Sequence, residues 1–498
     1  GATQGSFGPF ARPDGEWGVT FDGASDYLDA NDGPTFGSGA FTIELFVNLR
    51  TLGSVQVFFD ARPDSTNGLY PMLFVNSNNT LNYYVSSGAR ITSSETLSAN
   101  RWYHVAVSRT STSTKMFLDG TQVGSTYSDS NNYPDSGRMR VGTSSYSVGD
   151  GFHVNGVISN VRVVNSALYT SNFTAPTGKL TAVTNTKLLT CQSNRFVDNS
   201  ADGLTMTPSG DTAVSAFGPF LTDEVYDPAV NGASAYFDGN GDSLLINSPP
   251  SSFGTSNFTI EAWVYKLASS GGSPILSQGD GDAVNTRAVS SFGVGSTVAV
   301  LQVYDPVGGN RILLQTAAGT IPSKSWNHIA LTHQYTNSSS STYKIWINGV
   351  LTSTLNHTGG YNWNSGAGSG NPIGIDNYRF DGSGGAESYM QDTRLVVGSL
   401  VYTSNFTPPT APLTAITNTQ LLLNMQDAQA IDSAAQNNLT LYGNAKLSTT
   451  QSEFGDTSLA LDGNGDYAAL TDTTVGNFGA GNFTIECWFR SDQFDSLR

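Results

Sequence analysis

The chain has 498 residues, which at about 150 residues per domain is enough for about three domains. Lys and Arg number 23, Asp and Glu number 40, the net charge is −17, and 38% of the residues are hydrophobic. This supply of apolar side chains excludes a wholly disordered chain. The sequence has no cluster of Lys and Arg that fits a phosphate backbone and no apolar run long enough for a membrane span. We therefore expect neither nucleic-acid binding nor membrane insertion.

Sequence motifs recur at intervals of more than 200 residues, which indicates an array of repeated domains. An Asp-Gly motif with a second Asp starts at Phe21, Phe237 and Leu461, and a Phe-Thr-Ile-Glu motif starts at Phe41, Phe258 and Phe483. The run Phe7-Gly8-Pro9-Phe10, here called the FGPF motif, returns at residues 217–220. The first and last residues of the chain fall inside repeats, so we expect the sequence to be a segment of a longer chain.

The Phe-Thr-Ile-Glu motifs predict β-strands. Apolar residues recur at every second position over 41–47, 258–264 and 483–489, which is the period of a strand with one face in a core. Asp119-Gly120 and Asn348-Gly349 are dipeptides typical of hairpin turns. We therefore predict an all-β fold of tandem antiparallel β-sandwiches.

The repeats predict three domains. We expect a sandwich without its N-terminal edge at 1–185, a second sandwich at 186–417, and the start of a third, truncated one at 418–498. Prolines at 174–178 and 407–412 predict stiff, extended connectors that leave each sandwich.

The two cysteines stand at non-equivalent positions of different repeats. Cys487 replaces Leu45 and Ala262 of the other copies, so we expect it on the buried face of a strand. Because Cys191 belongs to another domain, we predict that both thiols are free. A cysteine-poor, acidic chain rich in Asn, Ser and Thr fits a virion, extracellular or cell-surface location.

The order of the motifs resembles that of laminin-G-like, concanavalin A-like jelly rolls. The motifs are the Asp-Gly motif, Phe-Thr-Ile-Glu, Trp-x-His-x-Ala at 102–106 and 326–330, the hairpin dipeptide, and a last strand with Arg162 or Arg394. The resemblance implies tandem concanavalin A-like lectin or glucanase domains. The stretch at 168–174 and its copy at 401–407 are also similar to tandem domains in fibre proteins of marine cyanobacterial tailed phages. That similarity implies a virion fibre or surface appendage.

The Asp-Gly motifs supply paired carboxylates that could bind calcium. The pairs are Asp22 and Asp26, Asp238 and Asp242, and Asp462 and Asp466. Alternate oxygens on a tight turn can wrap a hard cation, and the resemblance favours calcium because laminin-G-like domains often carry it. An EF-hand is excluded, since Ser243 and Tyr467 stand where its sixth-position glycine is required. The alternative is an Asp-Gly turn that needs no metal.

Three glutamates and two histidines recur without a catalytic pattern. A retaining glycosidase needs a second carboxylate close to the first, but the positions two and four residues after Glu44, Glu261 and Glu486 hold other residue types. We expect these glutamates to be structural hydrogen-bond acceptors. His104 and His328 have no nucleophile motif nearby, so we expect core histidines and no enzyme activity.

The loops before the last strand of each repeat differ between copies, which is where we expect ligand specificity. In the second repeat these loops hold Tyr361, Trp363, Asp376 and Tyr378. Exposed aromatic rings can stack on sugars and carboxylates can bond their hydroxyls, so we predict that these residues bind glycans. The alternative is that the aromatic rings cover the ends of the sandwich.

These observations favour a non-catalytic structural and adhesion protein of a virion or surface appendage. Its partners would be cell-surface glycans or other virion and appendage proteins, within a larger homo-oligomeric assembly that sums weak contacts. One alternative is a purely structural filament or capsid decoration protein. The other is a binding-module segment of a secreted glycan-active enzyme.

Overall fold

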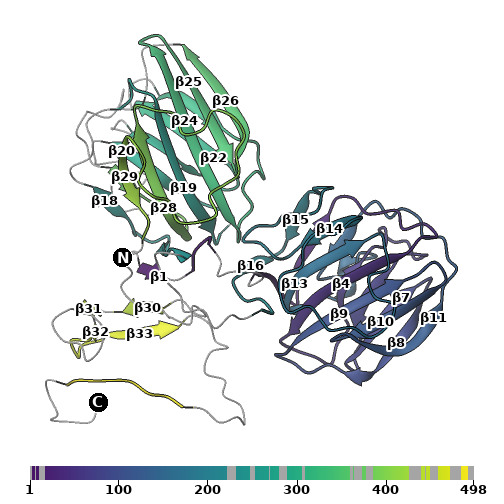
Figure 1. The fold of residues 1–498 in the computed structure, drawn as a ribbon. Coiled ribbons are helices and arrows are strands. Elements are labelled where there is room, and N and C mark those ends of the chain that lie inside the picture. The colour runs from purple at the N-terminus through teal and green to yellow at the C-terminus, as the bar shows by residue number, and fades with distance from the viewer. Residues whose placement is uncertain are drawn as a thin grey trace.

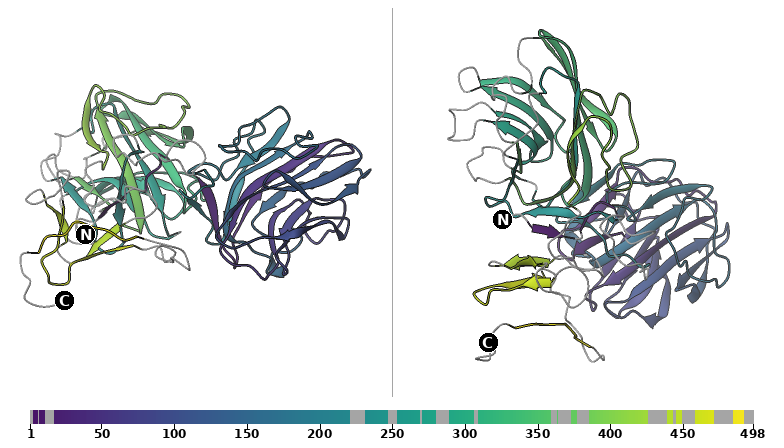
Figure 2. Two further views of the ribbon diagram at one scale, coloured as in Figure 1. Left: turned by 60° about the horizontal axis from the view of Figure 1, so that its bottom comes forward. Right: turned by 60° about the vertical axis from the view of Figure 1, so that its left-hand side comes forward.

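The computed structural model describes residues 3–5, 7–10, 17–220, 231–246, 253–268, 270–279, 289–305, 309–358, 363, 373–376, 385–425, 439–442, 445–448, 458–470 and 484–491. It confirms the all-β prediction, since the chain folds into antiparallel β-sheets, with a short 3-10 helix at Val148–Asp150. Figures 1 and 2 show two β-sandwiches followed by a few C-terminal strands. Among the described residues, no helix is long and apolar enough to cross a membrane.

The first sandwich, called sandwich 1, consists of an eight-stranded and a seven-stranded sheet. The eight-stranded sheet runs β11 (Thr121–Ser128), β10 (Ser113–Leu118), β9 (Trp102–Arg109), β4 (Phe41–Leu49), β13 (Asn155–Val164), β2 (Gly18–Asp22), β16 (Ala213–Ser215), and β14 (Thr186–Thr190) also pairs with β13. The other sheet runs β15 (Met206–Ser209), β3 (Tyr27–Ala30), β12 (Met139–Val141), β5 (Gln56–Asp60), β6 (Met72–Val75), β7 (Thr80–Val85), β8 (Gly88–Thr96).

The second sandwich, called sandwich 2, repeats this topology with two differences among the described residues: an N-terminal strand takes the place equivalent to that of β16, and no strand equivalent to β15 is present. Its eight-stranded sheet runs β26 (Val350–Thr358), β25 (Ser340–Ile347), β24 (Trp326–Asn337), β19 (Phe258–Lys266), β28 (Ser388–Val397), β17 (Ser234–Phe237), β1 (Thr3–Gly5), and β29 (Thr419–Leu423) also pairs with β28. Its six-stranded sheet runs β18 (Leu244–Ile246), β27 (Ile373–Ile375), β20 (Ser273–Gly279), β21 (Val289–Val294), β22 (Ala299–Asp305), β23 (Gly309–Gln315). The N-terminal strand β1 takes the edge position that β16 takes in sandwich 1 (Figure 1).

The core of each sandwich lies between its two sheets, as the period of two predicts. Phe41, Ile43 and Leu45 on β4 belong to one buried apolar cluster, and the equivalent residues of β19 belong to another. Thr42 and Glu44 on the opposite face of β4 are also fully buried. That second face is buried because a segment of the chain, residues 165–185, covers it. We call this segment the strap.

The strap corrects the prediction of connectors that leave each sandwich. It joins β13 to β14 of the same sheet and lies across β4 and β9, where the Leu168 amide donates to Thr42 Oγ1 and the Tyr169 amide to Ser108 Oγ. The rings of Tyr169 and Phe173 stack at 3.6 Å, and the Phe173 amide donates to the Gly120 carbonyl. A Cβ on Gly120, whose φ is +79°, would lie 2.1 Å from the Phe173 carbonyl oxygen, so this turn requires glycine. The arrangement recurs at Gly349 and Phe406.

The pairing of sandwich 1 continues beyond the predicted domain limit at 185, because β14, β15 and β16 all belong to its sheets. In the C-terminal repeat, β30 (Leu439–Tyr442) pairs with β33 (Tyr467–Leu470), and β31 (Lys446–Ser448) pairs with β32 (Ser458–Ala460). Strand β30 lies close to β1, the edge strand of sandwich 2.

Both cysteines are free, as predicted, but Cys487 is exposed and does not lie in a core. Residues 484–491 form no strand. In the complete sandwiches, the equivalent strands β4 and β19 are held between two neighbours that come later in each repeat. In the described part of the third repeat, no strand flanks residues 484–491, and Cys487 is exposed.

Candidate functional site

Trp363, predicted to stack on a sugar, lies in the core of sandwich 2. Its exposed fraction is 0%, it packs against Phe253 and Phe258, and its indole N–H donates to Gln278 Oε1 at 3.1 Å. The prediction of an exposed ring is therefore wrong for this residue, because the large apolar ring fills the end of the sandwich. Tyr361 and Tyr378 lie outside the described residues.

Asp376 is also buried rather than turned to a ligand-binding surface, which corrects its predicted role. It follows β27 with a φ of +52°, and the Gly385 amide donates to its Oδ2. Its Oδ1 has no hydrogen-bond partner among the described residues. Burial, together with the charge of Asp242, raises the pKa of this carboxyl to about 8, although the Gly385 amide lowers it. The equivalent residue in sandwich 1 is Gly142.

The three predicted metal turns share one hydrogen-bonding pattern. In each, the second carboxylate accepts the amide of the first Asp, and the first carboxylate accepts the amide two residues on. The pairs are Asp22 and Asp26, Asp238 and Asp242, and Asp462 and Asp466. These bonds alone close an Asp-Gly turn.

The fit of these turns to calcium differs between the sandwiches. In sandwich 1 the remaining oxygen of Asp26 accepts the Asp211 amide, so both of its oxygens are occupied. In sandwich 2, Asp242 lies close enough to interact with Asp376, whose Oδ1 is buried without a partner. No group of three His, Cys, Asp or Glu side chains that could hold a metal occurs among the described residues. Calcium binding at these turns stays a prediction.

Glu44 is a structural acceptor, as predicted. Arg162 donates two hydrogen bonds to Oε1 at 2.9 and 2.6 Å, while Tyr169 and His104 contact Oε2 at 2.8 and 3.0 Å. Burial alone would raise the pKa of Glu44, but His104 and Arg162 more than offset it and hold the pKa below its ordinary value. Because three side chains occupy this buried carboxylate, it is not free to act on a substrate. We call the four residues the strap clamp, since Tyr169 belongs to the strap.

Sandwich 2 carries the same clamp. Glu261 contacts His328 at 3.0 Å, Arg394 at 2.6 Å and Tyr402 at 2.6 Å. His328 is fully buried, which confirms the prediction of a core histidine. The recurring Glu and His of the sequence therefore hold the strap on the sheet in both sandwiches.

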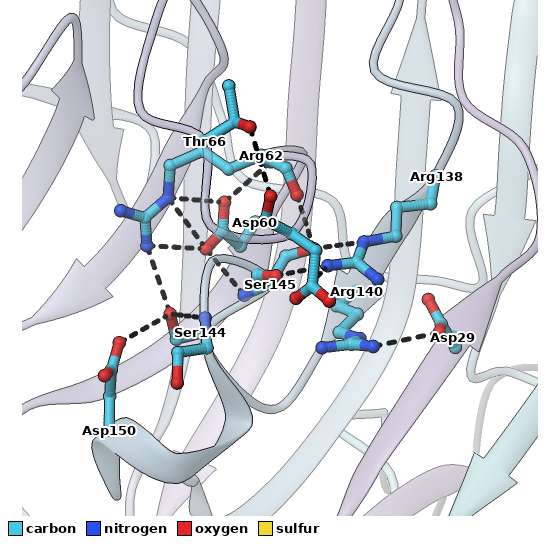
Figure 3. A network of polar contacts seen from close by, with 11 residues as sticks. Asp29, Asp60, Arg62, Thr66, Arg138, Arg140, Ser144, Ser145 and Asp150 are labelled. Carbon is cyan, nitrogen blue, oxygen red and sulfur yellow. Dashed lines mark hydrogen bonds and ion pairs between the residues drawn. The ribbon is translucent and has the colours of Figure 1, made fainter.

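The loops at one end of sandwich 1 are joined by a polar network, shown in Figure 3. Three arginines each pair with an aspartate: Arg62 with Asp60, Arg138 with Asp64 and Arg140 with Asp29. The Arg62 guanidinium also lies over the rings of Tyr84 and Tyr146. Most of these groups pair with one another, which orders this end of the sandwich, while Asp29 Oδ1 and Arg140 Nε are buried without a hydrogen-bond partner among the described residues.

The two sandwiches meet through an aromatic cluster that the sequence did not reveal. Its buried members are Phe10, Trp17, Val214, Trp263, Tyr265 and Trp326. They come from the N-terminal segment and from both sandwiches. The Trp326 amide donates to the Asn194 carbonyl, and Lys324 pairs with Asp211 at 2.8 Å. These contacts bring the outer face of β19 against residues 192–196.

A cavity of about 270 Å³ lies at this junction. It is lined by Pro9, Phe10, Trp17, Lys179, Gln192, Ser193, Asn194, Arg195, Trp263, Thr407, Pro408, Pro409 and Thr410. Two of these residues are cationic and none is acidic, although the chain as a whole carries a charge of −17. We call it the junction pocket.

Three polar atoms on residues that line the junction pocket are buried and have no hydrogen-bond partner among the described residues. They are Nε1 of Trp263, Nε of Arg195 and Oε1 of Gln192. Burial lowers the pKa of Arg195 from its ordinary value, yet a guanidinium remains charged at neutral pH. Buried donors without partners are costly, so the pocket is suited to a ligand that supplies acceptors and negative charge.

The family model of the concanavalin A-like lectin/glucanases superfamily matches residues 22–172 and 238–396, which is more than half of the chain. The chain belongs to this superfamily. The two matched segments are the cores of sandwich 1 and sandwich 2, so the superfamily domain occurs here in tandem. No curated protein sequence matches the chain.

Several solved structures are similar to the chain at low sequence identity. A proposed carbohydrate-binding protein from Bacteroides ovatus is 14% identical over 41% of the chain, which spans 60% of that protein, with a TM-score of 0.33. A pentraxin from Limulus polyphemus is 16% identical over 40% of the chain and 94% of its own length, with a TM-score of 0.32. Domains LG4-5 of mouse laminin alpha1 are 11% identical over 86% of the chain and 94% of their own length, with a TM-score of 0.27.

Sequence reasoning missed the junction pocket because its residues belong to no single motif. Trp263 stands where the first repeat has Phe46, and Arg195 lies near the start of the predicted second domain at 186–417. One signal was present, because the pocket-lining Pro9 and Phe10 belong to the FGPF motif. Its repetition indicated a repeated domain, but not what the motif contacts.

Proposed function

We propose that this chain is a non-catalytic, lectin-like protein of a virion or surface appendage and that its tandem sandwiches bind acidic glycans. The observation that carries the proposal is the junction pocket, with Arg195 and Lys179 in its lining and no carboxylate. Membership of the lectin and glucanase superfamily supports a carbohydrate as the ligand class.

The chemistry of the pocket favours a sugar that bears a carboxylate. An arginine guanidinium matches the geometry of a carboxylate and can bond it through two N–H groups. Lys179 is exposed and adds positive charge, and the side chains of Ser193, Asn194 and Thr410 can bond hydroxyls. A neutral sugar would leave the two cations without an anionic partner.

Binding rather than hydrolysis is supported by the state of the recurring glutamates. Glu44 and Glu261 are fully buried and each accepts hydrogen bonds from an arginine and a tyrosine. A glycosidase acid or nucleophile must reach the glycosidic bond. These two carboxylates serve the strap clamps instead.

A glycan array tests the proposal. The full chain should bind glycans with carboxylated sugars and not their neutral counterparts. Arg195→Gln and Lys179→Gln should each weaken binding, while Arg90→Gln, which removes one charge from the exposed side of β8, should not. Since Lys179 is exposed, its substitution leaves the fold intact. Equal binding of acidic and neutral glycans, or unchanged binding by both pocket variants, would refute the proposal.

The contacts between the sandwiches favour a second candidate function, a purely structural filament or decoration protein. The aromatic cluster of Trp17, Trp263 and Trp326 fixes the two sandwiches to each other. A protein of that kind would bind no glycan on the array. It would instead assemble with itself or with other appendage proteins, which sedimentation at increasing concentration would detect.

A further inference from the structure

Three short edge strands pair in the same register, although they belong to different repeats. Strand β1 pairs with β17, β16 with β2, and β31 with β32. The aligned pairs are Gln4 and Ala235, Val214 and Val19, and Leu447 and Leu459. These are equivalent positions, because Ala235, Val19 and Leu459 each lie the same distance before an Asp-Gly motif. We call β1, β16 and β31 the donor strands, and β17, β2 and β32, to which they add, the acceptor strands. This pairing therefore occurs three times in the chain.

The FGPF motif follows the donor strand and packs on an equivalent surface in each sandwich. On sandwich 1, the ring of Phe217 lies 5.4 Å from that of Trp102. The ring of Phe220 lies 4.9 Å from that of Phe46. Strand and motif thus form one unit, which we call the complementing segment. Its two complete copies are residues 3–10 and 213–220.

On sandwich 2, the N-terminal complementing segment makes the same contacts. Phe7 lies 5.5 Å from Trp326 and Phe10 lies 5.9 Å from Trp263. These tryptophans are the equivalents of Trp102 and Phe46. The carbonyl of Phe7 also accepts the hydroxyl of Ser234, on the acceptor strand itself.

The three donor strands differ in whether they pair with the following, the preceding or the adjacent repeat. Residues 3–5 pair with the acceptor of the following sandwich, residues 213–215 with that of the preceding sandwich, and residues 446–448 with the acceptor next to them in sequence. Sandwiches 1 and 2 have therefore exchanged complementing segments within one chain. The three strand pairs share one backbone register, so strand pairing itself does not restrict the exchange to one chain.

We propose that the complementing segment links copies of this chain. The segment at 3–10 of one copy completes the β17 edge of sandwich 2 in a second copy, in the register that it adopts within its own chain. An open sheet edge accepts an added strand through backbone hydrogen bonds. Exchange of an identical element between protomers forms an assembly without new contacts, because the intrachain contacts are remade between chains. This linkage rests on strand pairing and does not require a glycan, although Pro9 and Phe10 of the segment also line the junction pocket.

Disulfide trapping tests the exchange with full-length chains. Thr3 and Tyr236 are aligned partners in the strand pair, so Thr3→Cys gives a donor variant and Tyr236→Cys an acceptor variant. Both also carry Cys487→Ser, because that native thiol is exposed. The two variants are mixed at high protein concentration under oxidising conditions and separated by non-reducing electrophoresis. A third variant carries both Thr3→Cys and Tyr236→Cys, and an internal disulfide in it shows that the two strands pair within one chain.

We expect a disulfide-linked dimer of donor with acceptor as the main crosslinked product, in excess of dimers of either variant with itself. Phe7→Ala with Phe10→Ala in the donor should abolish it, because these rings anchor the segment. The matched change Phe217→Ala with Phe220→Ala leaves the donor segment intact and should preserve it. The proposal is overturned if the donor–acceptor dimer does not exceed the level of the Phe7→Ala, Phe10→Ala control. An internal disulfide in the double-cysteine chain with no such dimer would overturn it equally.

Discussion

The strap clamp of sandwich 1 should be its most sensitive point outside the apolar core. Glu44→Gln keeps the size of the side chain but removes the negative charge from a carboxylate that lies between Arg162 and His104. Breaking a buried ion pair in this way leaves an unpaired charge and costs about 3–5 kcal/mol. Tyr169→Phe removes only a hydrogen bond to that carboxylate, which is worth about 1.5–3 kcal/mol.

The matched control is Tyr127→Phe, which loses a hydrogen bond to the neutral side chain of Asn131 and should cost about 0.5–1.5 kcal/mol. For a domain of this size, each kcal/mol lowers the melting temperature by about 2–4 °C. Calorimetry measures the whole effect, and hydrogen exchange of the strap localises it. The contribution of the strap clamp to the stability of sandwich 1 should also be lost in acid. Since the pKa of Glu44 is held below its ordinary 4.5, its contribution is present above that pH and is lost as the pH falls through the lowered value.

The reasoning would be refuted if Glu44→Gln melted within the range of the Tyr127→Phe control. It would also be refuted if the strap kept its protection from hydrogen exchange in that variant. Glu261→Gln should reproduce the effect in sandwich 2, because the second clamp has the same contacts.

Three further predictions concern titrating groups. The pKa of Asp376 is raised from 3.8 to about 8. The contribution of this group to the stability of sandwich 2 should therefore be greatest below pH 3.8 and should fall by at most about 1.4 kcal/mol per pH unit up to pH 8. Asp376→Asn should abolish that pH dependence, and an unchanged pH dependence in the variant would contradict the assignment. If Asp242 and Asp376 hold calcium, a chelator should lower the melting temperature of sandwich 2 but not of sandwich 1, whereas no shift would leave plain Asp-Gly turns. Burial raises the pKa of Cys191 to about 12, so alkylation of the folded chain near pH 8 should modify Cys487 and spare Cys191. Mass spectrometry of tryptic peptides measures both modifications, and alkylation of Cys191 in the folded chain would contradict this prediction.

The strands could be predicted because their period depends on local sequence alone. The alternation over 41–47 places Phe41 and Ile43 in the core, as observed. That period does not reveal that the second face of the same strand is also buried. The strap that covers it comes from residues more than 100 positions later, so its contact with Glu44 depends on tertiary structure.

The ligand-binding residues could not be predicted in the same way. An aromatic residue in a variable loop can face solvent or close the end of a sandwich, and Trp363 does the latter. The FGPF motif was visible as a repeat, but every acceptor edge has the same register. Local sequence therefore cannot select which sandwich receives Phe7 and Phe10. The junction pocket depends on that choice, since Phe10 and Trp263 both line it.

The most direct test of glycan binding is a crystal structure of the chain with glucuronate, the simplest carboxylated hexose. We predict electron density for the sugar in the junction pocket, with its carboxylate beside the Arg195 guanidinium, and no density there in crystals soaked with glucose. Glucuronate bound elsewhere, or density for both sugars or for neither in this pocket, would contradict the assignment.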